Sequence, residues 1–231
     1  MLLMCSLVTL SPYWSRYPAI GLGLAAAMAF VPPYVFRLTD ELAMSSRTDA
    51  MTTLRNKQGF NELLDKLCRD VVATKTGGAV VLIDLDGFKK INDEQGHDGG
   101  DEVLKHIAYW LCVELGTFGT PARFGGDEFS VIIHKLVDIN ALESALNRFL
   151  ERAADVGKLF GSPLSASIGV YQVAAGAVVT PRFVFKAADE LMYLAKKMGK
   201  KQYQTSTGAT FCPDGKLKYH PSLPATRSEA A

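Results

Sequence analysis

The chain has 231 residues, which allows one domain of ordinary size together with additional segments. Its net charge is +1 and its pI is about 7.7, so the overall charge gives no reason to expect a nucleic acid polymer as a partner. The four cysteines lack the close spacing of metal ligands and do not suggest a disulfide framework. This pattern fits a reducing cytoplasm for the main domain.

The first 36 residues form an apolar segment in which Arg16 is the only charged side chain. Residues 17–36 are uncharged, and as a helix they would extend roughly 30 Å, about the thickness of bilayer hydrocarbon. Pro32 and Pro33 interrupt the final turn. We therefore predict an N-terminal membrane helix within residues 1–36, either complete or the remnant of a larger membrane region. A buried core helix is the alternative.

Basic side chains follow this apolar segment, at Arg37, Arg47, Arg55 and Lys57. Because positive charge favours the cytoplasmic side, this pattern predicts an inner-membrane protein whose remaining residues lie in the cytoplasm. We expect the following organisation: a membrane segment at 1–36, a connector at 37–47, the main domain at 48–204 and a disordered tail at 205–231.

Hydrophobic periodicity predicts the elements of the main domain in chain order. These are a helix at 58–72, a strand at 79–85, a loop at 96–100, a helix at 101–115, a hairpin around 123–133, a helix at 140–160, a strand at 165–173 and a helix at 183–198. The mixture predicts an α+β fold in which a central, mainly antiparallel sheet is wrapped by helices.

The first strand ends in two carboxylates, Asp84 and Asp86. Residues i and i+2 of a strand share a face, so these two side chains point together while Leu85 points away. A carboxylate at the end of a buried strand is costly unless it is paired or bound to a metal. The strand end is therefore a candidate metal site.

The hairpin carries a second acidic pair, Asp127 and Glu128, directly after Gly125 and Gly126. The glycines permit positive φ and close approach of another molecule, and the carboxylates are hard oxygen ligands. A solvated acidic turn is the alternative for this pair taken alone. If the hairpin lies beside Asp84, the three carboxylates form a cluster suited to one or two Mg²⁺ ions at a nucleotide's phosphates.

Other polar residues have both a structural and a functional interpretation. Asp101 lies at the start of a predicted helix, where it could cap the helix. Together with Asn92 it could instead recognise a guanine by hydrogen bonds. A lone loop histidine such as His97 is usually only a hydrogen-bonding residue. Lys89 could meet a phosphate. Lys196 and Lys200 are four residues apart on the last predicted helix, where they either complement the helix dipole or complete a triphosphate site.

Several motifs occur in order in the main domain. They are Asp49-Ala-Met-Thr-Thr-Leu54-Arg-Asn56-Lys57, Asp84-Leu-Asp-Gly-Phe-Lys-Lys-Ile-Asn92-Asp, Gly96-His97-Asp-Gly-Gly100-Asp101, Gly125-Gly-Asp-Glu-Phe129, Ser167-Ile-Gly-Val170, and Ala188-Asp189 through Tyr193-Leu-Ala-Lys196. With these motifs and spacings, residues 48–204 resemble a GGDEF domain of the diguanylate cyclase family. The resemblance implies a nucleotidyl-cyclase palm-like fold.

The resemblance also implies roles for individual residues. Mg²⁺ or Mn²⁺ would be held by Asp84, the Leu85 carbonyl, Asp127 and Glu128. Asn92 and Asp101 would read guanine, which favours the functional interpretation of Asp101 over a plain helix cap. The other implied substrate-binding residues are Lys89, His97, Gly125, Gly126, Lys196 and Lys200. Asp127 or Glu128 would also help to deprotonate the attacking hydroxyl, and the sequence leaves the choice between them open.

The implied activity is the condensation of two GTP molecules into cyclic di-GMP and two pyrophosphates by a homodimer. The alternative is a catalytically silent module that binds GTP as a sensor or interaction domain. Three departures from the family pattern stand out. Thr53 and Lys57 replace a glycine and an arginine in the opening motif, and Lys200-Lys201 replaces a common Arg-Asn. The product-binding R-x-x-D motif is absent, with Gly116 and Gly119 at its charged positions.

Overall fold

The computed structural model describes residues 29, 31–35, 47–136 and 138–206. The chain divides into two compact units, residues 1–46 and residues 47–231, and the second contains the predicted main domain. In the described part of the chain, no helix is both long enough and apolar enough to cross a membrane. The predicted membrane helix and connector fall almost entirely outside the described residues, so both stay predictions.

Helices and strands alternate through the described residues of the second unit, except that β2 is followed directly by β3. Their order is α4 (Lys57–Thr74), β1 (Gly78–Asp86), α5 (Phe88–Leu115), β2 (Thr120–Gly125), β3 (Glu128–Ile133), α6 (Ile139–Leu159), β4 (Ser165–Val173), α7 (Pro181–Lys197) and β5 (Gln202–Ser206). The predicted helices, strands and hairpin are all present. β5 was not predicted, because its residues are mostly polar and show no apolar run. Thr205 and Ser206, predicted to begin a disordered tail, belong to this strand.

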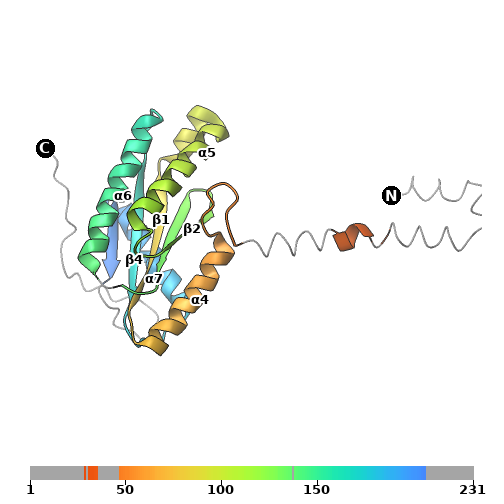
Figure 1. Cartoon of the computed structure of the whole chain (residues 1–231). Helices are drawn as coiled ribbons and strands as arrows, with labels where there is room; N and C mark the ends of the chain where they lie inside the picture. The colour runs from red at the N-terminus through yellow and green to blue at the C-terminus, as the bar shows by residue number, and fades with distance from the viewer. Residues whose placement is uncertain (1–28, 30, 36–46, 137, 207–231) are drawn as a thin grey trace, which may run out of the picture. The chain divides into compact units, whose positions relative to one another are not determined.

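The five strands form one sheet in the order β2-β3-β1-β4-β5, with β1 at its centre (Figure 1). The β2–β3, β3–β1 and β1–β4 pairs are antiparallel, and the β4–β5 pair is parallel. The predicted α+β architecture, with its mainly antiparallel sheet, is therefore confirmed. The parallel edge follows from the connection through α7, which returns the chain to the same end of the sheet.

Helices cover both faces of the sheet (Figure 1). β1 directs Val81 and Ile83 into the core beneath α5 and α6, and it directs Val80 and Leu82 into the core beneath α4 and α7. Asp84 and Asp86 continue the phase of Leu82, because alternate residues of a strand share a face. The two carboxylates consequently lie at the end of β1 on the α4/α7 face.

Side chains cap three of the helices at their N-termini. The Asn56 side chain accepts a hydrogen bond of 3.0 Å from the Gly59 amide at the start of α4. Asp138 caps α6 by accepting from the two amides at residues 140 and 141, and Thr180 caps α7 ahead of Pro181. These residue types satisfy amides that have no partner within the helix, and proline suits the first helical position.

α5 corrects one prediction. Residues 96–100 were predicted as a loop, but they lie within α5, which runs through a kink at Gly96 with φ 76° and ψ 177°. The glycine absorbs the change of direction in one residue, because it adopts positive φ without strain. Asp101 therefore lies inside the helix and is not a cap.

The end of α7 corrects a second prediction. Lys196 and Lys200 were placed on one helix, but α7 ends at Lys197 and Lys200 lies in the following turn with φ 64°. Gly199 takes φ 117°, and the Lys200 amide donates to the Ala195 carbonyl at 3.1 Å. This six-to-one hydrogen bond is the usual way in which a glycine ends a helix.

The segment ahead of α4 folds back on itself before the helix begins. Thr48 and Arg55 form an antiparallel bridge, and Arg55 also pairs with Ala122 on the edge strand β2. Asp49 accepts hydrogen bonds from the amide and the hydroxyl of Thr52, at 2.9 and 2.7 Å. The tight turn forces Thr53 into φ 59°, a conformation that a β-branched residue rarely adopts.

We expect Thr53→Gly to stabilise the domain. Glycine removes the left-handed strain, although it adds chain entropy to the unfolded state, so the net gain is about 1 kcal/mol. For a domain of this size that corresponds to a rise in melting temperature of roughly 2–4 °C by calorimetry. Thr53→Ala is the matched control, because it keeps a Cβ at positive φ. Equal melting temperatures for the glycine and alanine variants would contradict the strain.

Candidate nucleotide and metal site

Strand pairing brings the acidic end of β1 and the hairpin turn together. Asp84 lies opposite Glu128 in the β1–β3 register, and the Leu85 amide donates to the Asp127 carbonyl at 3.3 Å. The three carboxylates that the sequence analysis grouped therefore lie at one edge of the sheet. The same strand end faces β4, where Asp84 pairs with Ser167.

A lysine from α7 reaches this edge. The Lys196 ammonium lies 2.8 Å from a carboxylate oxygen of Asp84, and both side chains are partly buried. Burial raises the pKa of Asp84 above its ordinary value, and the negative charge of Asp127 adds to the rise, while Lys196 opposes it. Burial likewise raises the pKa of Glu128, with further contributions from Asp84 and Asp127. Asp84, Asp127 and Glu128 together therefore carry more negative charge than Lys196 neutralises.

The donors at this edge fit a divalent cation in type and in charge. Three carboxylates and one lysine leave an excess of negative charge, and oxygen ligands are those that Mg²⁺ prefers. Within the described residues, however, no three acidic, histidine or cysteine side chains converge closely enough to enclose an ion by themselves. A cation here would need oxygen ligands beyond side chains, such as a main-chain carbonyl or a phosphate.

The turn that joins β2 to β3 (the signature turn, residues 125–127) is open on its outer side. Gly125 and Gly126 take φ 139° and 55°, and a Cβ added to either glycine would meet no atom within 4 Å. The glycines are therefore required by the backbone conformation and not by crowding. The open surface beside them leaves the main chain accessible to another molecule.

A buried arginine holds this turn from behind. Arg123 is 8% exposed, and its guanidinium donates to the Gly126 carbonyl at 3.1 and 2.9 Å. The same group pairs with Asp49 at 3.2 Å. Burial opposes ionisation of Asp49, but the hydrogen bonds from Thr52 and the charge of Arg123 outweigh it and lower the pKa of that carboxyl. The sequence analysis missed this link, since its two ends are distant in the chain.

Asp86 occupies a different environment from Asp84. One of its oxygens accepts from the Ser167 hydroxyl at 2.8 Å and from the Ser165 hydroxyl at 3.4 Å. Its other oxygen faces the Lys200 ammonium at 3.7 Å. Thus the two lysines singled out in the sequence, Lys196 and Lys200, each meet one of the two carboxylates at the end of β1.

The remaining predicted site residues lie on α5. Lys89 and His97 are exposed, whereas Asn92 and Asp101 are half-buried. The Asn92 side chain packs against Gly100 so closely that a Cβ there would overlap its amide oxygen. Gly100 therefore lets the two turns on either side of the kink approach, and it brings Asn92 next to the residue that precedes Asp101.

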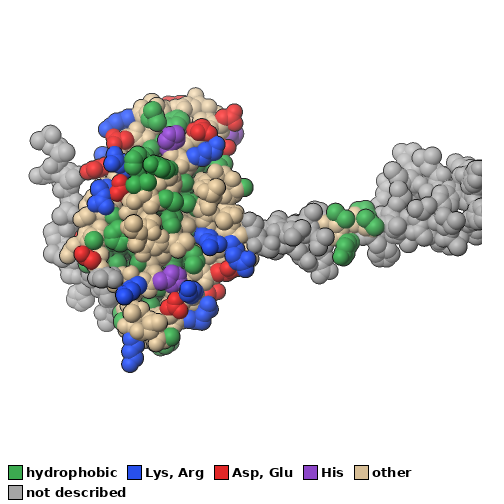
Figure 2. Space-filling view, viewed as in Figure 1, with side chains coloured by type: hydrophobic (Ala, Val, Ile, Leu, Met, Phe, Trp, Pro, Cys, Tyr) green, Lys and Arg blue, Asp and Glu red, His purple; other side chains and the backbone are tan. Residues whose placement is uncertain are grey.

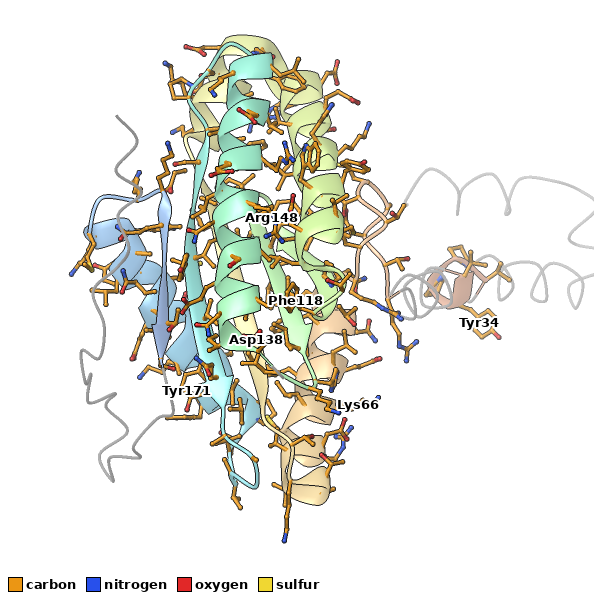
Figure 3. All side chains as sticks on the ribbon, turned by 60° about the vertical axis from the view of Figure 1, so that its left-hand side comes forward. Tyr34, Lys66, Phe118, Asp138, Arg148 and Tyr171 are labelled. Atoms are coloured by element: carbon orange, nitrogen blue, oxygen red, sulfur yellow. The ribbon has the colours of Figure 1, made fainter. Side chains whose placement is uncertain are left out.

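The turn where the family pattern would have R-x-x-D is tightly packed. A Cβ at Gly119 would overlap the Ile132 carbonyl of β3, and Phe118 packs against the main core. Nearby, Arg148 of α6 points towards α5 and donates to the buried Glu114 at 2.7 Å (Figure 3). Arg152 also pairs with Glu114 and stacks on Trp110. The two arginines are thus engaged with α5.

On the visible face of the molecule, positive and negative side chains are interspersed (Figure 2). This pattern agrees with the nearly balanced composition of 25 basic and 24 acidic residues. A nucleic acid polymer would require a continuous basic surface, and this face does not provide one.

Comparison with known proteins shows the family to which the chain belongs. The sequence profile described as "Diguanylate cyclase, GGDEF domain" matches residues 46–202. The chain belongs to the GGDEF diguanylate cyclase family. The profile covers β1, the signature hairpin and α7, which together form the acidic edge described above.

Two curated relatives and one solved structure illustrate the similarity. Diguanylate cyclase TpbB from Pseudomonas aeruginosa (strain UCBPP-PA14) is 36% identical over 172 residues, which cover 71% of this chain and 39% of TpbB. Response regulator PleD from Caulobacter vibrioides (strain NA1000 / CB15N) is 38% identical over 164 residues, covering 66% of this chain and 34% of PleD. The chain thus matches well under half of each relative.

The solved structure shows the fold. The coiled coil and GGDEF domain of DgcB from Caulobacter crescentus, determined in complex with c-di-GMP, has a TM-score of 0.63 to this chain at 23% identity. The match covers 79% of this chain and 99% of the DgcB structure.

The raised pKa of Glu128 predicts a pH-dependent stability. Ionised Glu128 destabilises the fold at neutral pH, and the penalty disappears as the pH falls through the raised pKa towards the ordinary value of 4.5. Glu128→Gln should therefore increase the free energy of unfolding at pH 7, and the gain should vanish below about pH 4.5. Urea denaturation between pH 7 and pH 3 measures it.

Asp49→Asn is the control with the opposite sign. Its lowered pKa means that ionised Asp49 stabilises the fold above the ordinary value of 3.8, and this stability is lost as the pH falls through the lowered pKa. The variant should have a lower free energy of unfolding than the wild type at pH 7. This difference should shrink only as the pH falls below 3.8. A gain for Glu128→Gln that does not change with pH would show that crowded charge is not its cause.

Proposed function

We propose that this chain condenses two GTP molecules into cyclic di-GMP with release of two pyrophosphates. The observation that carries the proposal is the convergence of Asp84, Asp127 and Glu128 with Lys196 at one edge of the sheet. Membership of the GGDEF family supports the choice of substrate and product.

In this proposal, each 3′-hydroxyl attacks the α-phosphate of the other nucleotide. Asn92 and Asp101 read the guanine, and Lys89, Lys196 and Lys200 meet the phosphates. A cation such as Mg²⁺ or Mn²⁺, held by Asp84, the Leu85 carbonyl, Asp127 and Glu128, would neutralise charge that develops on the phosphates. His97 borders the nucleotide from α5, and Gly125 with Gly126 lets it approach the backbone.

Glu128 is the carboxylate that we assign to receive the proton of the attacking hydroxyl. Burial and the neighbouring carboxylates raise its pKa before any cation binds, which favours a proton on this group. Glu128 lies opposite Asp84 in the strand register, so in this proposal it would border the phosphates. Asp127 lies at the tip of the turn, next to Gly126, and would act with Asp84 on the cation.

Two equivalent phosphodiester bonds form in the product, so two GTP-loaded domains must meet about a two-fold axis. The active species in this proposal is a homodimer. The predicted membrane segment and connector would raise the local concentration of the pair at the inner membrane, with the catalytic domain in the cytoplasm.

The test is incubation of the purified chain with GTP and Mg²⁺, followed by chromatography for cyclic di-GMP. We expect product, and a rate per molecule that rises with protein concentration in the micromolar range. Asp127→Ala and Glu128→Ala should each lower turnover by at least roughly 100-fold, because each removes a charge that acts on the reacting groups. Glu102→Ala is the matched control, since this exposed carboxylate of α5 pairs with Lys105 of the same helix.

Three results would contradict parts of this proposal. Bound GTP without product at any protein concentration would favour the catalytically silent GTP-binding module. A rate per molecule that does not change with concentration, in protein shown to be monomeric, would reject the dimer. Near-normal turnover in the Asp127 or Glu128 variant would reject the assignment of the acidic edge.

Weak product inhibition is a second expected outcome. The R-x-x-D pair binds product by charge-assisted hydrogen bonds, and Gly116 and Gly119 offer no such groups. Nearby Arg148 and Arg152 are engaged with Glu114. In the same assay, added cyclic di-GMP should compete with GTP only at high concentration. Tight non-competitive inhibition by cyclic di-GMP would contradict this expectation. If the Arg148→Ala variant then lost that inhibition, the inhibitory site would lie on the α6 surface.

A further inference from the structure

Asp86 is a buried carboxylate at the acidic edge to which the proposed function gives no role. It is 8% exposed, and a charge in that position is costly unless its oxygens are satisfied. The hydroxyls of Ser167 and Ser165 both donate to one oxygen, at 2.8 and 3.4 Å. The other oxygen is left to face Lys200 at 3.7 Å. The serines thus hold Asp86 in an orientation that serves Lys200.

Lys200 needs such a partner, because no helix positions it. It lies beyond the end of α7, in a turn where Gly199, Lys200 and Lys201 have φ values of 117°, 64° and 50°. Two consecutive non-glycine residues in this region carry backbone strain. The Ala195 carbonyl accepts from both the Lys200 amide and the Gln202 side chain, at 3.1 Å each, and so holds the main chain of the turn. Within the described residues, the ion pair with Asp86 orients the Lys200 side chain.

The spacing of the two lysines fits the spacing of the two carboxylates. Asp84 and Asp86 are two residues apart on a strand, a rise of roughly 6.6 Å. Lys196 and Lys200, four residues apart, meet them one to one. The Lys196 side chain is 32% exposed in its pair, whereas the Lys200 side chain is 57% exposed. Lys200 is therefore the more accessible of the two lysines for a ligand while it stays paired.

We propose that Asp86 is a positioning residue that holds the Lys200 ammonium at the acidic edge, where it binds the β- and γ-phosphates of GTP. The inference rests on the proposed function, since it assigns Asp86 a part in substrate binding at the same site. Asp86 acts through Lys200 and does not itself contact the nucleotide. Its loss would leave Lys200 free to move with the strained turn, which would cost affinity for a triphosphate but not for a nucleotide that lacks the distal phosphates.

The experiment measures equilibrium binding to the full chain in the presence of Mg²⁺. The probes are a GTP analogue with a methylene group between the α- and β-phosphates, which cannot react, and GMP. We expect Asp86→Asn to weaken analogue binding about tenfold, the loss of one charge-assisted contact, while GMP affinity stays unchanged. Asp86→Asn retains the shape of the side chain and groups able to hydrogen-bond with the two serines.

Two further variants make the test specific. Lys200→Met should show the same selective loss, and the double variant should be no weaker than Lys200→Met alone, because the two residues act as a unit. If Asp86→Asn fails to fold, Ser167→Ala should give a smaller loss of the same selectivity. Lys197→Ala is the matched control, since this exposed lysine of α7 stacks on Tyr193 and should leave both affinities unchanged.

Four outcomes would overturn the inference. The first is an unchanged affinity of Asp86→Asn for the analogue, and the second is an equal loss for the analogue and GMP, which a purely structural role would produce. The third is an additive loss in the double variant. The fourth is a higher Mg²⁺ requirement without any loss of triphosphate selectivity, which would make Asp86 a metal ligand. Failure of the wild-type chain to bind either nucleotide would overturn the proposed function as well.

Discussion

The antiparallel pairing of β1 with β3 is the constraint on which the site depends. It places Asp84 opposite Glu128, and it brings the Leu85 amide to the Asp127 carbonyl. A shift of one residue in this register would turn the buried side chains of β3 to the wrong face of the sheet, so the apolar core enforces the alignment of the carboxylates. The same core residues that stabilise the sheet therefore hold repulsive charges together.

Charge balance at this edge comes from the segment around the end of α7. Lys196 pairs with Asp84 from the last turn of the helix, and Lys200 pairs with Asp86 from the turn beyond it. Gly169 of β4 lets α7 pack close, because a Cβ there would overlap the main chain of the helix at Ala188 and Met192. The close packing of helix on sheet and the neutralisation of the acidic edge are thus parts of one arrangement.

A second connection joins the segment ahead of α4 to the signature turn. Arg123 bonds the Gly126 carbonyl and pairs with Asp49, while Arg55 bridges to the edge strand at Ala122. Nearly all of the Arg123 side chain is buried, so its charge requires both partners. The conformation of the turn that carries Asp127 and Glu128 is thereby tied to the point at which the chain enters the domain.

Much of the fold and of the candidate site could be predicted from the sequence, because periodicity, paired carboxylates and the glycine signature are local patterns. Contacts between distant residues could not: Arg123 with Asp49, Asp86 with Ser167, and the polar strand β5, which pairs with β4 and bonds to α7 through the Gln202 side chain. The glycines at 96 and 199 marked breaks, but they did not show that the helix continues through the first as a kink within α5 and that α7 ends before the second. The sequence by itself determined which charged groups the site contains. Only the tertiary structure decided which charge meets which, because that depends on strand register and on where each helix ends.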